Sequence, residues 1–364
     1  MKRILQITDS MGMGGIQAFI MNVYRNIDRE KYQFDFLLHQ KMENGYDDEI
    51  LKMGGNIYYI PSRHEGIIKN RKALEKFFSK HPEYTVVHQH ESSLTYIEPL
   101  VIAKKYNVPV RIMHSHSTRA SGSKIHTLLH KINIHRIKNV ATNYFACGEL
   151  AGKWMYNGSG VEKKVIIVNN GIDIKKYSFD ETIRKKLRIE LGLDKKFVIG
   201  NVGRFSEVKN HTFLIDVFNE FVKLYPDSEL VLVGDGDLQQ DMKNKVKKLS
   251  LSDKVQFLGI RRDVHTILMS FDYVVIPSLY EGFPVTAIEA QAIGVPCLIS
   301  DSVTKDVVIN NNVKMLSLRE SADVWADQIY KNKKVQRNSN KEGLIKKGFD
   351  IATTTDYLLE IYKE

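Results

Sequence analysis

The chain has few of the features that mark secreted or membrane-spanning proteins. It contains only two cysteines, Cys147 and Cys297, which lie far apart in apolar surroundings. This excludes a disulfide framework and predicts a reducing compartment. No apolar run reaches about 18 residues, and the first apolar segment is too short and mixed for a signal peptide. Internal repeats and low-complexity tracts are also absent. We therefore expect a cytoplasmic protein.

The composition that is present is ordinary for a globular protein, apart from an excess of positive charge. Of 364 residues, 43% are hydrophobic and 26% are charged, and the formal net charge is +10. The chain is too long for one core. Short apolar strands alternate with helical stretches through both halves, which predicts an α/β fold of two doubly wound parallel sheets.

Two glutamates eight positions apart, Glu281 and Glu289, straddle a predicted strand-to-helix turn. Residues 271–277 form an apolar run closed by proline, as in a short buried parallel strand. Gly282 permits a sharp turn, and Pro284 suits the first helical position. The N–H groups at such a helix start favour phosphate, so the two carboxylates could hold hydroxyls on either side of it. For the pair alone, a capping acid plus a solvated helix acid is the alternative.

Two cations stand at a similar position in an earlier segment. The apolar strand 197–202 runs into Gly203, and Arg204 and Lys209 follow before a helix. Arginine offers a planar fork of donors to phosphate oxygens, and lysine a mobile point charge, so together they suit a diphosphate. Two solvated surface cations are the alternative. Between the segments, strand 229–233 runs into Gly234, at a turn of the kind that lets backbone approach a nucleotide.

The spacing of Glu281 and Glu289 resembles the E-x7-E motif of retaining glycosyltransferases of family 4. These enzymes have the GT-B fold, two Rossmann-like domains that face each other across a cleft. The resemblance covers nearly the whole chain, is strongest over residues 170–301, and extends to bacterial capsular and exopolysaccharide enzymes. It implies a retaining glycosyltransferase that moves a sugar from a nucleotide sugar, with a UDP-sugar as the expected donor. The implied acceptor is a growing glycan, including a lipid-linked one, in surface polysaccharide synthesis.

The resemblance also implies roles for individual residues. Glu281 would lie by the donor sugar, and Glu289 would hold the ribose. The catalytic candidates are Glu281, Arg204, Lys209, His116 and His114. The donor-binding candidates are Glu289, Gly14, Gly15, Gly203, Gly234, Gly282, Phe283, Pro284 and Val285. No metal or cofactor is required.

Histidines gather after two predicted strands of the first half. His88 and His90 follow strand 84–87, and a second pair, His114 and His116, follows strand 108–113. Neither pair has a nearby carboxylate or cysteine to complete a tetrahedral set, so we expect no metal site. Family 4 enzymes carry a histidine near the donor sugar after the corresponding strand. The match falls on His114 or His116, with His116 slightly favoured because possible helix caps follow it, while hydrogen-bonded strand-end histidines are the alternative.

A glycine-rich loop follows the N-terminal strand, and a helix is predicted from about Gln17 to Asn26. The loop is not a dinucleotide-binding fingerprint, because Gln17 stands where the third glycine belongs. By the resemblance, Gly14 and Gly15 lie across the cleft from the donor diphosphate and border the acceptor. Gln17 replaces an acidic residue often found there, so the acceptor contacts stay open.

The resemblance also suggests where the domains divide. Residues 169–173 resemble the family segment that joins the two domains. We expect an acceptor-side domain over 1–171 and a nucleotide-sugar-binding domain over 172–349. A C-terminal helix at about 350–364 should pack back on the first domain.

Positive charge is concentrated between residues 111 and 138. The cations there are Arg111, Arg119, Lys124, Lys131, Arg136 and Lys138. Interleaved apolar residues predict one or two amphipathic helices with a basic face, suited to an anionic membrane surface. We therefore expect a peripheral protein at the inner face of the cell membrane. A solvated helix face is the alternative, and nucleic acid is not expected because no recognition module occurs.

Two other functions remain open at this point. A nucleotide-sugar epimerase of similar two-domain shape would need acids and a histidine placed to abstract a sugar proton. A non-enzymatic basic surface-binding protein would have its charge as its function.

Overall fold

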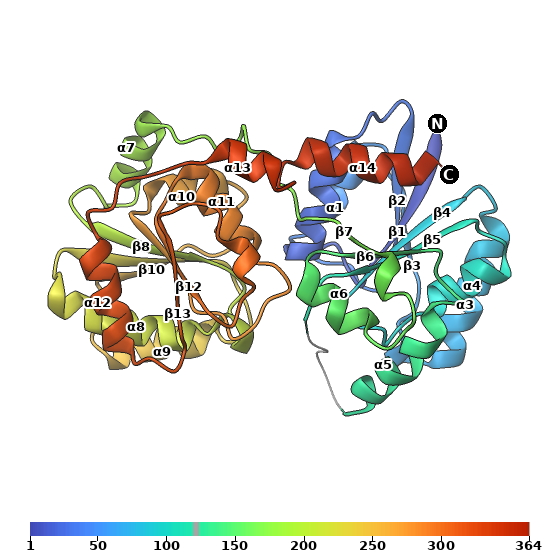
Figure 1. Ribbon diagram of the computed structural model, residues 1–364, viewed down its shortest axis with the longest axis horizontal. Coiled ribbons are helices and arrows are strands. Elements are labelled where there is room, and N and C mark those ends of the chain that lie inside the picture. The colour runs from blue at the N-terminus through green and yellow to red at the C-terminus, as the bar shows by residue number, and fades with distance from the viewer. Residues whose placement is uncertain (119–123, 364) are drawn as a thin grey trace. The chain divides into compact units, whose positions relative to one another are not determined.

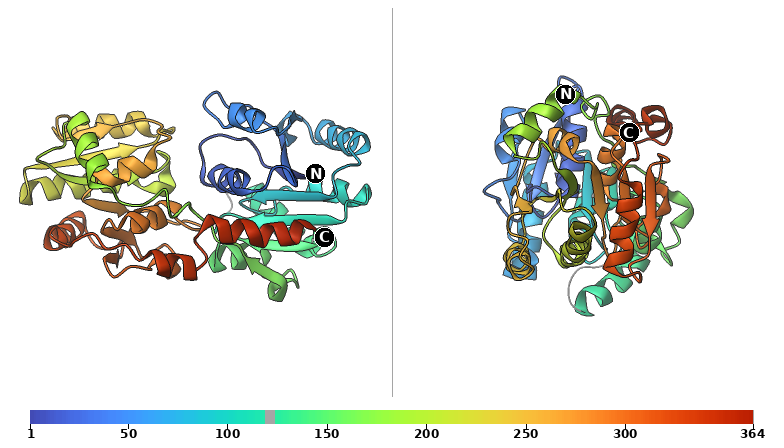
Figure 2. Two further views of the ribbon diagram at one scale, coloured as in Figure 1. Left: turned by 90° about the horizontal axis from the view of Figure 1, so that it is seen from above. Right: turned by 90° about the vertical axis from the view of Figure 1, so that its left-hand side faces the viewer.

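The computed structural model describes residues 1–118 and 124–363, which form two compact units (Figure 1). The first unit comprises residues 1–171 and the C-terminal helix α14 (Ile351–Lys363), and the second comprises Ile172–Asp350. Each unit contains one parallel sheet with helices on both faces (Figure 2). The predicted fold class, two doubly wound parallel-sheet domains, is confirmed.

The sheet of the first unit has the strand order β3-β2-β1-β4-β5-β6-β7. Its strands are β1 (Lys2–Ile7), β2 (Tyr32–Leu38), β3 (Ile57–Tyr59), β4 (Val86–Glu91), β5 (Val110–Ser115), β6 (Asn143–Ala146) and β7 (Val165–Ile167). Its other helices are α1 (Gly15–Asn26), α2 (Asp47–Lys52), α3 (Ile67–Lys80), α4 (Glu98–Lys105), α5 (Lys124–Ile137) and α6 (Glu149–Tyr156), with short 3-10 turns η1 (Arg63–Glu65) and η2 (Glu162–Lys164).

Alternation along the strands divides the core of this unit into two layers. Leu5 and Ile7 of β1 pack with residues of α3, α4 and α6, while Ile4 packs on the opposite face with α1 and α14. Figure 1 shows α14 beside α1, and these two helices are in contact. Each such buried aliphatic side chain contributes about 1.5–3 kcal/mol. This burial ties the C-terminal helix to the first unit.

The sheet of the second unit has the order β10-β9-β8-β11-β12-β13. Its strands are β8 (Phe197–Val202), β9 (Ser228–Val233), β10 (Val255–Phe257), β11 (Tyr273–Ile276), β12 (Cys297–Ser300) and β13 (Val313–Leu316). Its helices are α7 (Glu181–Glu190), α8 (His211–Leu224), α9 (Gln239–Lys248), α10 (Val264–Ser270), α11 (Val285–Ile293), α12 (Ala322–Asn332) and α13 (Lys341–Lys346), with 3-10 turns η3 (Glu207–Lys209) and η4 (Lys305–Val307).

Both sheets reverse their strand order once, between β1 and β4 in the first unit and between β8 and β11 in the second. Open parallel sheets bind ligands at the carboxyl ends of the strands that flank such a reversal, because the two loops diverge there. This topology selects the loops after β1 and β4, and those after β8 and β11, as candidate binding regions.

Four of the observed elements differ from the predicted ones at a boundary. Strand β4 continues through His88 and His90, and β5 includes His114, so these histidines lie within strands. All three are polar but buried, and His90 and His114 pack against Phe19 of α1, which a hydrophobic pattern cannot anticipate. Helix α1 begins at Gly15, ahead of the predicted Gln17. Helix α11 begins at Val285, with Pro284 as its N-cap in extended conformation.

Candidate functional site

The loops after β8 and β11 are joined to each other in the second unit. The backbone N–H of Leu279 donates to the carbonyl of Val208 at 2.8 Å, and the Asn210 side chain donates to the carbonyl of Pro277 at 3.2 Å. The two segments singled out from the sequence therefore form one site at the reversal of strand order.

The centre of this site is an ion pair between two of the predicted residues. Lys209 Nζ lies 2.7 Å from Glu281 Oε2, and the Lys209 and Glu281 side chains are 25% and 9% exposed. Ser278 Oγ donates to the other carboxylate oxygen at 2.5 Å. A cation and a hydroxyl therefore hold Glu281. Lys209 remains partly exposed to solvent at the carboxyl ends of the strands. Ser278 was not identified from the sequence.

Arg204 lies on the same loop but apart from this pair. Its nearest acid is Asp237, at 3.6 Å, and both side chains are largely exposed. Exposed pairs of this kind contribute little, so the guanidinium can exchange Asp237 for another anion at small cost.

Two glycines allow two backbone segments, 203–205 and 234–236, to meet beside Lys209. Gly234 has φ +135°, and a Cβ there would lie 2.2 Å from the carbonyl oxygen of Gly203. Gly236 has φ +155°, and a Cβ there would lie 2.5 Å from the carbonyl oxygen of Phe205. Both positions therefore require glycine. Gly203 in turn lies beneath the Lys209 side chain. A Cβ placed on Gly203 would lie 3.5 Å from Lys209 Cδ.

Helix α11 begins next to the ion pair with its first turn free of capping side chains. Pro284 is the N-cap, no side chain caps the helix, and the first turn contains no acidic residue. Thr286 Oγ1 donates to the carbonyl of Val202 at the end of β8, at 3.3 Å. Gly282 precedes the buried Phe283, whose ring stacks on Phe349 with centroids 5.1 Å apart. A helix start without a capping side chain or an acid is the geometry in which helix N-termini bind anions.

Glu289 lies further along α11 and has a different partner. The Tyr177 hydroxyl donates to Glu289 Oε1, and burial raises the pKa of the Glu289 carboxyl. Tyr177 is 112 positions away in the sequence, which is why sequence reasoning missed it.

The first unit brings four histidines together on one face of its sheet. His88 Nε2 lies 3.1 Å from His114 Nδ1, and His90 Nδ1 lies 2.9 Å from His116 Nε2. The ring of Phe19, from α1, packs on three of them. His114 is fully buried whereas His116 is partly exposed. Burial lowers the pKa of all four, to about 3 for His116, so they are neutral at pH 7.

The nitrogens of His88, His90 and His114 are close enough to be considered as metal ligands. The ring planes of His88 and His114 are 10° apart, and those of His88 and His90 are 26° apart. His88 Nε2 and His114 Nδ1 already share a hydrogen bond at 3.1 Å, which a metal ion bound by both nitrogens would have to displace. The geometry favours a hydrogen-bonded cluster over a metal centre.

The glycine loop after β1 leads directly into α1. Gly14 is the N-cap residue of α1 and Gly15 its first residue. The Gln17 side chain folds back over the loop and donates to the carbonyl of Ser10 at 2.9 Å. Gln17 therefore organises the loop at the position where we noted the absence of an acid.

Glu91, at the end of β4, is a further residue that the sequence did not reveal. Its Oε1 accepts a hydrogen bond from Gln89 at 2.9 Å. Burial raises the pKa of Glu91 to about 8, and the neighbouring Asp9 acts in the same direction. A strongly shifted carboxyl beside a reversal of strand order is a common property of functional sites.

The basic segment is only partly helical. Arg111 lies in β5, and its guanidinium donates to the carbonyls of Val140 and Val108, so it is not part of a basic helix face. Arg119 lies outside the described residues. In α5, Lys124 and Lys131 are exposed, as is Lys138 just beyond it. The exposed apolar residues of α5 are Ile125, Leu128 and Ile132, and the helix sequence contains no acid.

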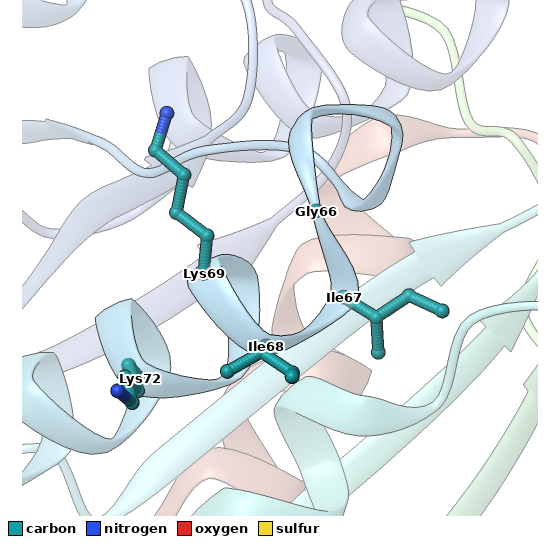
Figure 3. Close-up of a pocket in the computed structure, with 5 residues that line it drawn as sticks. All are labelled: Gly66, Ile67, Ile68, Lys69 and Lys72. Carbon is teal, nitrogen blue, oxygen red and sulfur yellow. The ribbon is translucent and has the colours of Figure 1, made fainter.

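A surface hollow lies at the start of α3 (Figure 3). Its lining is Gly66, Ile67, Ile68, Lys69 and Lys72. None of the candidate site residues contributes to it.

Among the described helices, none is both long and apolar enough to cross a membrane.

Comparison with known proteins identifies the class and then the family. The chain aligns over its full length with the crystal structure of Anabaena HepE in complex with UDP and glucose, with a TM-score of 0.82 and 19% identity. This likeness, covering 100% of both chains, confirms the GT-B fold. The family described as glycosyl transferases group 1 matches residues 182–345.

Two sequence relatives extend this match beyond the second unit. A putative glycosyltransferase of Bacillus subtilis, EpsF, is 35% identical over 99% of this chain and 96% of its own length. A UDP-Gal:alpha-D-GlcNAc-diphosphoundecaprenol alpha-1,3-galactosyltransferase of Escherichia coli is 28% identical over 96% of this chain and 94% of its own. The chain belongs to the glycosyl transferases group 1 and is a glycosyltransferase.

Proposed function

We propose that this protein is a retaining glycosyltransferase of family 4 that transfers a sugar from a UDP-sugar to a growing glycan in surface polysaccharide synthesis. The observation that carries the proposal is the Lys209–Glu281 pair at the start of α11, where charge, carboxylate and helix N-terminus meet at one reversal of strand order. The complexes of HepE with UDP and with UDP-glucose support this type of donor, and the galactosyltransferase supports a lipid-linked acceptor.

The donor would occupy the second unit, with its diphosphate between α11 and the loop after β8. Lys209 and Arg204 would stabilise the negative charge that develops on the leaving diphosphate. Glu281 would face the sugar, and Glu289, oriented by Tyr177, would accept hydrogen bonds from the ribose hydroxyls. Backbone groups around Gly203, Gly234 and residues 282–285 would line the diphosphate and nucleoside.

The first unit would supply the acceptor side. In the proposed retaining reaction, the anomeric C–O bond to the diphosphate breaks, and the acceptor oxygen bonds to the same face of the sugar. The departing phosphate oxygen takes the acceptor proton, so no protein base, metal or cofactor is needed. His116 would contact a substrate hydroxyl, in preference to His114, because only His116 is partly exposed. Gly14 and Gly15 would border the acceptor.

Docking on an anionic membrane would bring the enzyme to a lipid-linked acceptor. Helix α5 offers the apolar stripe Ile125, Leu128 and Ile132, at helical spacing, with Lys124 and Lys131 next to it. Such a face suits the interface of an anionic leaflet. We place the enzyme in the cytoplasm at the inner face of the membrane.

A donor screen tests the proposal. Purified protein is incubated with UDP-glucose, UDP-galactose, UDP-N-acetylglucosamine and matched GDP- and dTDP-sugars, with and without a diphospholipid saccharide acceptor. Acceptor-dependent UDP release and an α-linked product from an α-linked donor are expected. A β-linked product would contradict retention, and an epimerised donor without transfer would identify an epimerase. The relatives are transferases, so the epimerase and the non-enzymatic binder are not carried further.

A further inference from the structure

His116 ends a chain of three hydrogen-bonded side chains that begins inside the first unit. Gln6 Oε1, on β1, lies 2.8 Å from His90 Nε2, and His90 Nδ1 lies 2.9 Å from His116 Nε2. Gln6 is 1% exposed and His90 is 3% exposed. Two rigid, buried groups therefore support the one partly exposed histidine.

The chain fixes where each proton sits. A carboxamide oxygen only accepts, so His90 must donate from Nε2. His90 is neutral because burial holds its pKa well below the usual value, so its Nδ1 carries no proton and can only accept. His116 must then donate from Nε2, and its own Nδ1 is left as an unprotonated acceptor. None of the described residues hydrogen-bonds to that nitrogen.

We infer that Gln6 and His90 are positioning residues that hold His116 in the Nε2–H tautomer, so that its Nδ1 accepts a hydrogen bond from a substrate hydroxyl. The inference rests on the proposed function, in which His116 meets the substrate. Partner-fixed tautomers are a general way of setting which nitrogen of a histidine reacts.

The second pair of histidines provides an internal control. The Tyr362 hydroxyl lies 2.7 Å from His88 Nδ1, and His88 Nε2 bonds to His114. This chain is equally buried and belongs to the same cluster. The Tyr362 hydroxyl also interacts with Gln6, but neither this contact nor the His88–His114 bond includes a hydrogen bond to His116. Tyr362→Phe should therefore perturb the cluster without changing the His116 tautomer.

The test combines spectroscopy with kinetics. In protein labelled with ¹⁵N-histidine, nitrogen shifts separate the two tautomers, and the His116 signals are identified by their loss in His116→Asn. We expect Nε2–H for His116 in the wild type and in Tyr362→Phe, and a mixture in Gln6→Met and His90→Leu. Gln6→Met preserves the length and approximate shape of the buried side chain, so it should fold.

Turnover is measured with the most active UDP-sugar of the donor screen. Loss of one positioning hydrogen bond should lower kcat roughly 2- to 10-fold in Gln6→Met and His90→Leu with little change in KM. In His90→Asn the carboxamide oxygen replaces Nδ1 as the acceptor of the hydrogen bond from His116, so this variant should restore much of the lost kcat. An Nδ1–H tautomer in the wild type, or unchanged tautomer and kcat in both variants, would overturn the inference. Absence of transfer from every donor would instead refute the proposed function, while the NMR result still decides the tautomer.

Discussion

Lys209 and Glu281 neutralise each other at 2.7 Å in the second unit, although they come from loops that follow different strands. A donor diphosphate would compete with Glu281 for the lysine. In the proposed function, the pair would keep both side chains in place before the donor binds, and would release the carboxylate towards the sugar when phosphate takes the cation.

Removing the cation should therefore lower turnover more than donor affinity. We expect Lys209→Met to reduce kcat roughly 100- to 1000-fold, as for loss of a group that stabilises transition-state charge, and Arg204→Ala to act in the same direction. Steady-state kinetics and UDP calorimetry measure the two effects. Lys245→Met is the matched control, because Lys245 forms a similar 2.6 Å pair with Asp216 outside the site. Wild-type kcat in both Lys209→Met and Arg204→Ala would disprove the assignment.

The two glutamates should differ in what they bind. Glu289→Ala would leave ribose hydroxyls unpaired and weaken UDP binding by about 1–3 kcal/mol, and Tyr177→Phe should produce a smaller loss. Glu281→Ala should retain UDP affinity but lose transfer. Calorimetry with UDP on the three variants measures this. If Glu281→Ala loses affinity for UDP and Glu289→Ala retains it, the assignment of the ribose to Glu289 and of the sugar to Glu281 is reversed.

The sequence predicted which segments form the site but not how their side chains pair. The alternation of short apolar strands with helical stretches was sufficient to predict two parallel sheets, since this pattern depends on local geometry. The Lys209–Glu281 and Tyr177–Glu289 contacts join residues far apart in the chain, and no local pattern encodes them. His88 and His90 were placed after a strand because a polar run after Val87 suggests solvent, whereas β4 continues through both residues and Phe19 packs on His90.

Helix α5 should account for membrane association. Each lysine near an anionic surface contributes about 1 kcal/mol, screened by salt. Changing Lys124, Lys131 and Lys138 together to Glu should abolish sedimentation with phosphatidylglycerol vesicles and leave donor hydrolysis intact. Changing Lys185, Lys186 and Lys195 to Glu alters the charge equally on another exposed surface and should have little effect. Equal losses in both triple variants would mean that net charge, rather than α5, drives binding.

Glu91 should make stability fall on the alkaline side. Its folded pKa, about 8, is above the usual 4.5, so its contribution is complete below about 4.5 and is lost as pH rises through 8. Glu91→Gln resembles the protonated acid and should remove this part of the decline. Melting temperatures at pH 6 and pH 9 measure the difference, which should be smaller in the variant. An unchanged difference would show that Glu91 ionises normally.

The four histidines should make the first unit sensitive to acid. Their folded pKa values are depressed, so stability is complete above the unfolded value of about 6.5 and falls as pH drops towards the value of about 3 for His116. Glu91 acts in the opposite direction over this range, because burial raises its folded pKa.

The two tryptophans allow this loss to be assigned to one unit. Trp154 lies in the first unit and Trp325 in the second, where burial depresses the pKa of His211 to about 4. Single-tryptophan variants, Trp325→Phe and Trp154→Phe, report each unit separately in urea titrations between pH 7 and 4.5. The midpoint reported by Trp154 should fall more steeply. His114→Gln removes one buried titrating group and should flatten that slope, whereas His64→Gln, at an exposed position on η1, should leave it unchanged. Parallel slopes for the two tryptophans would contradict the assignment of the acid sensitivity to the histidine cluster.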